Sequence, residues 1–201
     1  MTPELALALA GFAFAASITP GPNNLMLMAS GANFGLRRTL PHMLGVSLGH
    51  GFMVFVIGLG LLELFDRLPW LRLALTAVCS AYLLWLAWKI ATAAPPPEAQ
   101  AEGRPLTFLQ AAAFQWVNPK AIYMAITAQT SYAPSGGSWW AAAAVALIFA
   151  AVNLPSVSVW AWMGVQLKRL LGRGRKLRLF NAAMALLLVA TLVPVWVGLL
   201  E

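Results

Sequence analysis

The sequence predicts an all-α integral membrane protein, in which six transmembrane helices form an inverted repeat of two three-helix halves and helices 1 and 4 are interrupted. Of the 201 residues, 61% are hydrophobic and only 9% are charged, whereas soluble domains are about half apolar and a quarter charged. The apolar residues form runs of about twenty, the length that crosses roughly 30 Å of hydrocarbon as a helix. A lipid bilayer is therefore the expected solvent.

Six apolar stretches are long enough to be spans, and the main alternative has five, with one weak stretch that does not cross. A cleaved signal peptide is disfavoured, because no basic residue precedes the first stretch and its apolar character resumes beyond Pro22. The predicted spans are residues 3–29, 40–64, 70–90, 106–130, 138–165 and 179–200.

Basic residues set the predicted orientation. The loops after the first, third and fifth spans carry ten of them: Arg37, Arg38, Lys89, Arg104, Lys168, Arg169, Arg173, Arg175, Lys176 and Arg178. The loops after the second and fourth spans carry only Arg67 and Arg72. Because basic loops stay in the cytoplasm, we expect a multi-pass protein of the bacterial inner membrane with both termini in the periplasm. This distribution also disfavours a nucleic-acid partner, since the net charge of +7 forms no binding face.

A polar linker divides the chain into halves. Residues 93–105 hold the run Pro95–Pro97 together with acidic and amide side chains, a composition that stays solvated and forms no core. We expect it in the cytoplasm, between a first repeat at 1–92 and a second at 106–201. Each half has three spans, so the second enters the membrane in the opposite orientation, as an inverted repeat requires.

The first span of each half contains a break near its middle. The first break consists of Thr19, Pro20, Gly21, Pro22, Asn23 and Asn24, and the second of Asn118, Pro119 and Lys120. Proline removes a backbone donor, and unpaired backbone at that depth is tolerated only beside a cavity or buried protein. One proline alone usually only kinks a helix, but two matching breaks predict a substrate site. Free amides there can hold a carboxylate and free carbonyls an ammonium group.

Three polar side chains inside predicted spans need separate interpretation, and one of them, Lys120, belongs to the second break. Lys120 is the only basic residue deep in a span, where a charge costs roughly 3 kcal/mol, so we expect it to face the cavity and to bond backbone carbonyls or a substrate carboxylate rather than to snorkel. His50 follows the stripe Gly45–Gly49, whose small residues allow close helix approach. A structural role and a role in handling protons or substrate are equally open for it. Asn153 precedes Pro155 in another local break, where a kink is slightly favoured over substrate contact.

The sequence offers little to an enzyme. It has no paired carboxylates, no HExxH motif and no cysteine–histidine cluster, since Cys79 is the only cysteine and His42 and His50 are the only histidines. We therefore expect no catalytic residue, metal or cofactor. A membrane-embedded enzyme and an assembly protein without transport activity stay as alternatives, although a pure scaffold needs no unpaired backbone at the midplane.

Five segments together carry a resemblance to a known family: residues 18–24, Gly35, residues 45–49, residues 81–89 and residues 114–120. With them, nearly the whole chain resembles the lysine exporter family, also called the homoserine and threonine resistance family, of bacterial amino-acid exporters. The resemblance implies a secondary transporter that exports amino acids or close derivatives from the cytoplasm, driven by the proton motive force.

The segment 82–92 particularly resembles the branch that exports cysteine and O-acetylserine. Many family members carry an acidic residue where this chain has His50, so a proton role attached to that carboxylate does not transfer directly. The implied partners are an amino-acid substrate, a coupling proton and the lipid bilayer. A homo-oligomer is compatible with the sequence, which fixes neither the substrate nor the stoichiometry.

Overall fold

The computed structural model describes residues 1–61, 69–92, 104–134, 138–171, 175–193 and 197. All regular elements in these ranges are helices, in agreement with the predicted all-α class. They are α1 (Pro3–Ile18), α2 (Pro22–Phe34), α3 (Leu36–Val56), the π-helical turn η1 (Ile57–Leu61), α5 (Pro69–Ala91), α6 (Phe108–Gln115), α7 (Pro119–Tyr132), α8 (Trp139–Leu171) and α9 (Arg175–Ala190). The predicted linker at 93–105 falls almost entirely outside the described residues.

Each predicted span contains helix, and the first and fourth are interrupted as expected. Among the residues that the structure describes, two helices, Leu36–Gly60 and Trp139–Leu170, are long and apolar enough to cross a membrane, and a third span results if α1 and α2 count as one bent helix. The fold is thus that of a helical protein with membrane-spanning segments. Six crossings, the inverted repeat and the division into two repeats stay predictions.

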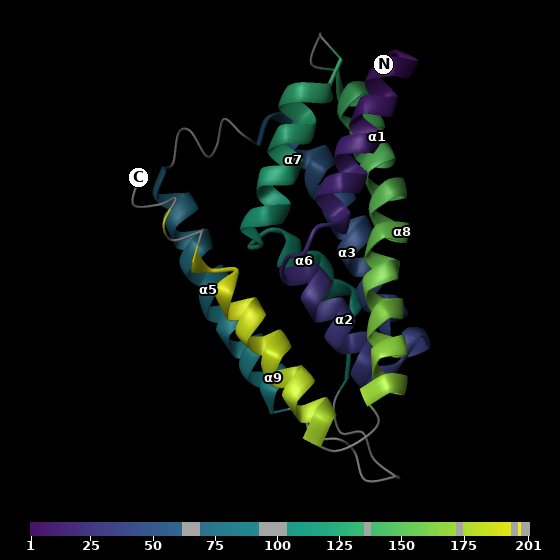
Figure 1. Cartoon of the computed structure of the whole chain (residues 1–201). Coiled ribbons are helices and arrows are strands. Elements are labelled where there is room, and N and C mark those ends of the chain that lie inside the picture. Colours follow the sequence, from purple (N-terminus) through teal and green to yellow (C-terminus); the bar gives the residue numbers. More distant parts are fainter. Residues whose placement is uncertain (62–68, 93–103, 135–137, 172–174, 194–196, 198–201) are drawn as a thin grey trace.

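Proline chemistry explains the first break. Thr19 precedes Pro20 and is extended, at φ −67° and ψ 145°, because a following proline disfavours the helical region. Pro22 then occupies the first turn of α2, where its missing N–H leaves no bond unmade. The axes of α1 and α2 differ by 58°, and Figure 1 shows the chain bending between them.

The second break is a short turn between α6 and α7. Helix α6 begins with a capping box formed by Thr107 and Gln110 and ends at Gln115. Asn118 then caps α7, since its Oδ1 accepts a hydrogen bond of 3.2 Å from the backbone N–H of Lys120. Pro119 follows at the first helical position, so the local sequence both stops one helix and starts the next.

Glycines bring the helix backbones into contact. Any Cβ on Gly45 would collide with the Phe108 carbonyl, and one on Gly49 would lie 2.5 Å from the Ala112 Cα, so the small-residue stripe packs α3 against α6 as expected. Where α2 crosses α8, Gly31 faces the Ala161 backbone and Gly164 faces the Met28 backbone in the same way. Gly35, at φ 80°, makes the turn from α2 to α3 that a side chain would strain.

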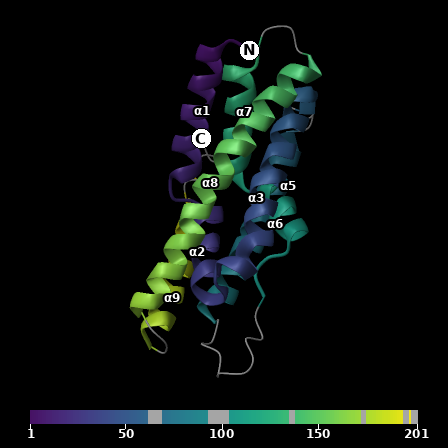
Figure 2. The same cartoon turned by 90° about the vertical axis from the view of Figure 1, so that its right-hand side faces the viewer.

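Helix α8 organises the bundle. It packs against α1, α2 and α3 and runs along the length of the molecule in Figure 2. Helices α5 and α9 lie side by side in Figure 1 and join the rest through an apolar cluster that includes Leu83, Leu188, Met26 and Phe114. Outward side chains such as Leu147 and Leu170 are 71% and 79% exposed, as suits a surface that faces lipid.

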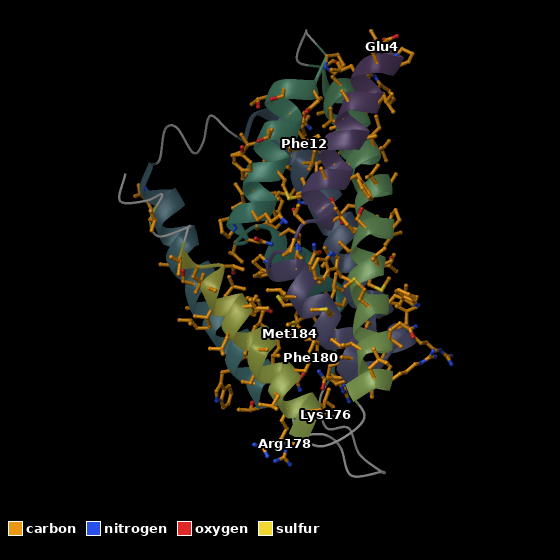
Figure 3. The ribbon with its side chains drawn as sticks, viewed as in Figure 1. Glu4, Phe12, Lys176, Arg178, Phe180 and Met184 are labelled. Carbon is orange, nitrogen blue, oxygen red and sulfur yellow. The ribbon has the colours of Figure 1, made fainter. Side chains whose placement is uncertain are left out.

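The labelled charged side chains at the two ends of the molecule differ in sign. Figure 3 shows Glu4 at one end and Lys176 and Arg178 at the other. The basic end also includes the start of α3, where Arg37 and Arg38 follow Gly35, because α2 runs from the break toward that end. Between the ends, five of the buried polar side chains line one cavity at the helix breaks, where the candidate site lies: Ser17, Asn24, His50, Asn118 and Asn153.

Candidate functional site

Side chains satisfy the carbonyls that the first break releases. Asn24 Nδ2 donates to the carbonyls of Ser17 and Thr19 at 2.8 and 2.7 Å. Trp160 Nε1 on α8 donates to the Ile18 carbonyl at 3.0 Å. Helix α1 therefore ends here without leaving these carbonyls unpaired, because side chains replace the helical N–H donors.

Lys120 joins the second break to the first. Its Nζ donates to the Thr19 carbonyl at 2.8 Å, to Thr19 Oγ1 at 2.9 Å and to the Pro20 carbonyl at 3.2 Å. Of the partners predicted for this lysine, backbone carbonyls are the ones that the structure shows. These oxygens lie about 100 residues away from Lys120 in sequence, so the contact joins two distant segments of the chain.

An amide pair makes a second link between the breaks. Asn23 Nδ2 donates to Gln115 Oε1 at 2.8 Å, and Gln115 Nε2 donates back to Asn23 Oδ1 at 3.2 Å. Gln115 Nε2 also bonds the Ala111 carbonyl at 2.8 Å, and the residue is fully buried. The sequence prediction missed Gln115. The signal that could have found it is an amide inside an apolar helix, three residues before the second break.

A small cavity lies where the breaks meet. Its volume is about 20 Å³, which leaves room for roughly one water molecule and not for an amino acid. Of the predicted site residues, Thr19, Pro20 and Pro119 do not line it, and all the others do. The lining residues are Ala16, Ser17, Gly21, Pro22, Asn23, Asn24, His50, Asn118, Lys120, Ala121, Met124, Asn153 and Val157, of which none is acidic.

Two polar atoms of this lining are buried without a hydrogen-bond partner among the described residues, namely His50 Nε2 and Asn153 Oδ1. The Asn153 amide is oriented by its Nδ2, which donates to Ser17 Oγ at 2.9 Å. The His50 ring packs against Phe149 at 4.7 Å between centroids. Because leaving a buried polar atom unpaired is unfavourable, both atoms are natural points for a ligand to bond.

Helix α8 is continuous past Asn153, so the local break expected there is wrong. Pro155 lies inside the helix, and the hydroxyls of Ser156 and Ser158 bond the carbonyls of Val152 and Leu154 around it. A transmembrane helix can thus continue through a proline. Asn153 consequently keeps its place on the helix and lines the cavity.

The start of α2 borders the same cavity. Gly21 is its N-cap and makes no side-chain capping bond, while Asn23 and Asn24 in the first turn line the cavity. The first backbone N–H groups of a helix carry partial positive charge and bind anions such as carboxylates. Donors and acceptors thus stand next to each other at the junction of the breaks.

In its described part the chain is helical, with segments apolar enough to span a membrane and a polar cavity between two interrupted helices, which is the architecture of a membrane transporter. Comparison with known proteins gives the family. Residues 14–193 match the LysE type translocator family, and the chain belongs to that family. It is therefore a multi-pass membrane transporter and not an enzyme, and the resemblance that the sequence motifs indicated is confirmed.

Similar curated proteins cover almost the entire chain. A cysteine/O-acetylserine efflux protein of Escherichia coli strain K12 is 33% identical over 94% of this chain and 96% of its own length. Proteins of the same description from Escherichia coli O9:H4 and Shigella sonnei give the same identity and coverage. No solved structure matches the chain significantly.

Proposed function

We propose that this protein exports amino acids or close derivatives from the cytoplasm, and that its substrates are small and neutral, like cysteine and O-acetylserine. The family and the relatives described as efflux proteins for those two compounds support the proposal, because the family matches residues 14–193 and the relatives cover 94% of the chain. The observation that carries it is the meeting of the two helix breaks, which collects unlike polar groups at one place inside an apolar protein.

A zwitterionic substrate needs separated donors and acceptors. In the proposed complex the carboxylate lies at the start of α2, where the backbone N–H groups of Asn23 and Asn24 and the Lys120 ammonium surround it. The substrate ammonium bonds the oxygens of the first break and the side-chain oxygen of Asn118. Since the cavity holds about 20 Å³, it must widen to admit the substrate.

The unpaired atoms of His50 and Asn153 are proposed to bond the substrate side chain. Both line the cavity and both are buried, so a short polar side chain that reaches them regains the hydrogen bonds that they lack. No acidic residue lines the cavity, so a lysine-like substrate would find no counter-charge. This lining favours small neutral side chains over basic ones.

Proton motive force drives the export in this proposal, with the termini in the periplasm and the basic end of the molecule in the cytoplasm. The titratable groups that line the cavity are His50 and Lys120, and we propose His50 as the group that handles the coupling proton. Its place among packed helices, beside Asn153 and Phe149, allows it to respond when substrate enters.

Dipeptide loading tests the function. Cells with and without the protein are fed dipeptides that release serine, cysteine or lysine, and the amino acids outside are measured over time. We expect faster appearance of serine and cysteine, abolished by an uncoupler, and no change for lysine. Equal efflux of all amino acids with and without a well-expressed protein would refute the proposal.

A further inference from the structure

We infer that the three oxygens around Lys120 Nζ form the subsite for the α-ammonium group of the substrate, and that Lys120 fills this subsite as a tethered competitor while the site is closed. The inference rests on the proposed function. It assigns a ligand group to a named set of atoms and gives Lys120 a second role beside binding the carboxylate. We call the Thr19 carbonyl, Thr19 Oγ1 and the Pro20 carbonyl the ammonium cage.

The cage matches a primary ammonium group in number and distance. An ammonium has three N–H donors, and the cage offers three acceptors at 2.8, 2.9 and 3.2 Å from Lys120 Nζ. Two of these distances are those of charge-assisted hydrogen bonds. The oxygens follow the C-terminal end of α1, where the helix dipole is negative, so the cage attracts a cation although it contains no carboxylate.

Gly21 shows how closely the lysine stem lies on the start of α2. A Cβ on Gly21 would stand 2.8 Å from Lys120 Cδ and 3.1 Å from Nζ. Gly21 is the N-cap of α2, the helix end at which we propose that the carboxylate binds. With Lys120 in the cage, its stem therefore occupies space beside both halves of the zwitterion site, in agreement with a cavity of about 20 Å³.

Exchange of the two ammonium groups keeps every charge paired. When the substrate ammonium enters the cage, Lys120 Nζ leaves it and meets the carboxylate that arrives with the same molecule. One cation replaces another at the cage, and the lysine gains an anionic partner in place of three neutral ones. Neither Lys120 nor the substrate then needs to stand unpaired inside the membrane, where an isolated charge is strongly unfavourable.

Binding of a simple amine tests the cage apart from transport. Ethanolamine has the primary ammonium group but no carboxylate, and choline has the same charge without N–H donors. Purified full-length protein in nanodiscs is titrated with each. We expect Lys120→Met to bind ethanolamine at least about tenfold more tightly than the wild type, because the competitor is gone, while choline binding does not improve. Adding Thr19→Val to Lys120→Met removes one acceptor and should lower this gain.

A second variant covers the case in which Lys120→Met is not folded. Gly21→Ala keeps the lysine but its Cβ displaces the lysine stem, so ethanolamine should again bind more tightly than to the wild type. The matched control is Gly11→Ala, where an added Cβ meets nothing within 4 Å and binding should not change. No gain in folded Lys120→Met and Gly21→Ala, or an equal gain for choline, would overturn the inference.

The two proposals fail separately. Wild-type efflux of serine and cysteine without any gain in ethanolamine binding would reject the cage and keep the export function. A gain in ethanolamine binding with no amino-acid efflux would keep the ammonium site and reject the proposed transport.

Discussion

At the scale of single residues, the position of Lys120 is the central fact. A cation half-buried among helices would ordinarily be paired with an acid, yet its bonding partners here are neutral oxygens of Thr19 and Pro20. Neutral partners compensate a cation less completely than a carboxylate does. The arrangement therefore leaves Lys120 free to exchange these oxygens for an anion, which is what an amino-acid carboxylate supplies.

Replacing Lys120 by methionine should reduce export to less than about a tenth of the wild-type rate while the protein still inserts and folds. Methionine keeps much of the apolar stem but cannot pair with a carboxylate. Efflux from dipeptide-loaded cells, normalised to the amount of folded membrane protein, is the measurement. Lys120→Arg is the control that keeps the charge. Normal efflux by Lys120→Met would mean that the lysine only anchors a helix.

The amide pair between Asn23 and Gln115 should stabilise the contact of the two breaks. Replacing Asn23 by alanine leaves the buried Gln115 with one side-chain partner fewer, which costs about 1–3 kcal/mol in unfolding free energy. The double variant with Gln115→Ala should lose less than the sum of the two single changes. Thermal unfolding in detergent gives the comparison, and strict additivity would show that the pair does not interact.

At the scale of helices, the crossing of α2 and α8 fixes the geometry of the site. Gly31 and Gly164 allow the two backbones to touch. Two side chains of α8 then donate hydrogen bonds to the end of α1, Trp160 to the Ile18 carbonyl and Asn153 to the Ser17 hydroxyl. At the far end of α2, Asn33 and Asn181 exchange hydrogen bonds of 3.1 and 3.3 Å. Helix α2 is thus held at both ends, and its register decides where its first turn lies.

Enlarging a glycine at this crossing should destabilise the protein. Gly164→Ala forces the new methyl group into the Met28 backbone, so the helices must separate, at a cost of about 1–3 kcal/mol. Gly11→Ala is the control, because its Cβ meets nothing within 4 Å and alanine is the better helix former. The midpoint of thermal unfolding should fall for Gly164→Ala and hold or rise for Gly11→Ala. A fall of the same size in both would contradict the packing argument.

At the scale of the whole molecule, charge distribution predicts how the protein sits in the membrane. Basic residues gather at the end where α9 begins, and Glu4 lies at the opposite end (Figure 3). Because basic segments stay in the cytoplasm, the N-terminus should face the periplasm.

Single-cysteine labelling decides the orientation. In a Cys79→Ser background, which removes the only native cysteine, Glu4→Cys should react with a membrane-impermeant maleimide in intact cells, and Lys176→Cys only after the membrane is permeabilised. The opposite pattern would reverse the topology. Both variants must export normally for the result to apply to the native fold.

The helices and two of the helix breaks could be predicted from the sequence alone, because they depend on residues that are neighbours in the chain. Hydropathy and helix length indicated where the helices lie, and Pro20, Pro22 and Pro119 indicated where two of them are broken, because proline acts on its own turn of the chain. The orientation was likewise predicted from the positions of lysine and arginine in the sequence, because the positive-inside rule requires no tertiary contact. The rule for proline failed at Pro155, since α8 continues through that proline while it packs against α1, α2 and α3.

The partners of the polar groups were decided only by the tertiary structure. Gln115 meets Asn23 across 92 residues of sequence, and Lys120 meets Thr19 across 101, because close packing at the glycine crossings brings distant helices together. The same packing places His50 of α3 and Asn153 of α8 on the wall of one cavity. One polar atom of each, His50 Nε2 and Asn153 Oδ1, has no hydrogen-bond partner among the described residues. A sequence shows which side chains can bond, but which of them meet depends on the helix crossings, and these arise from contacts that no local pattern encodes.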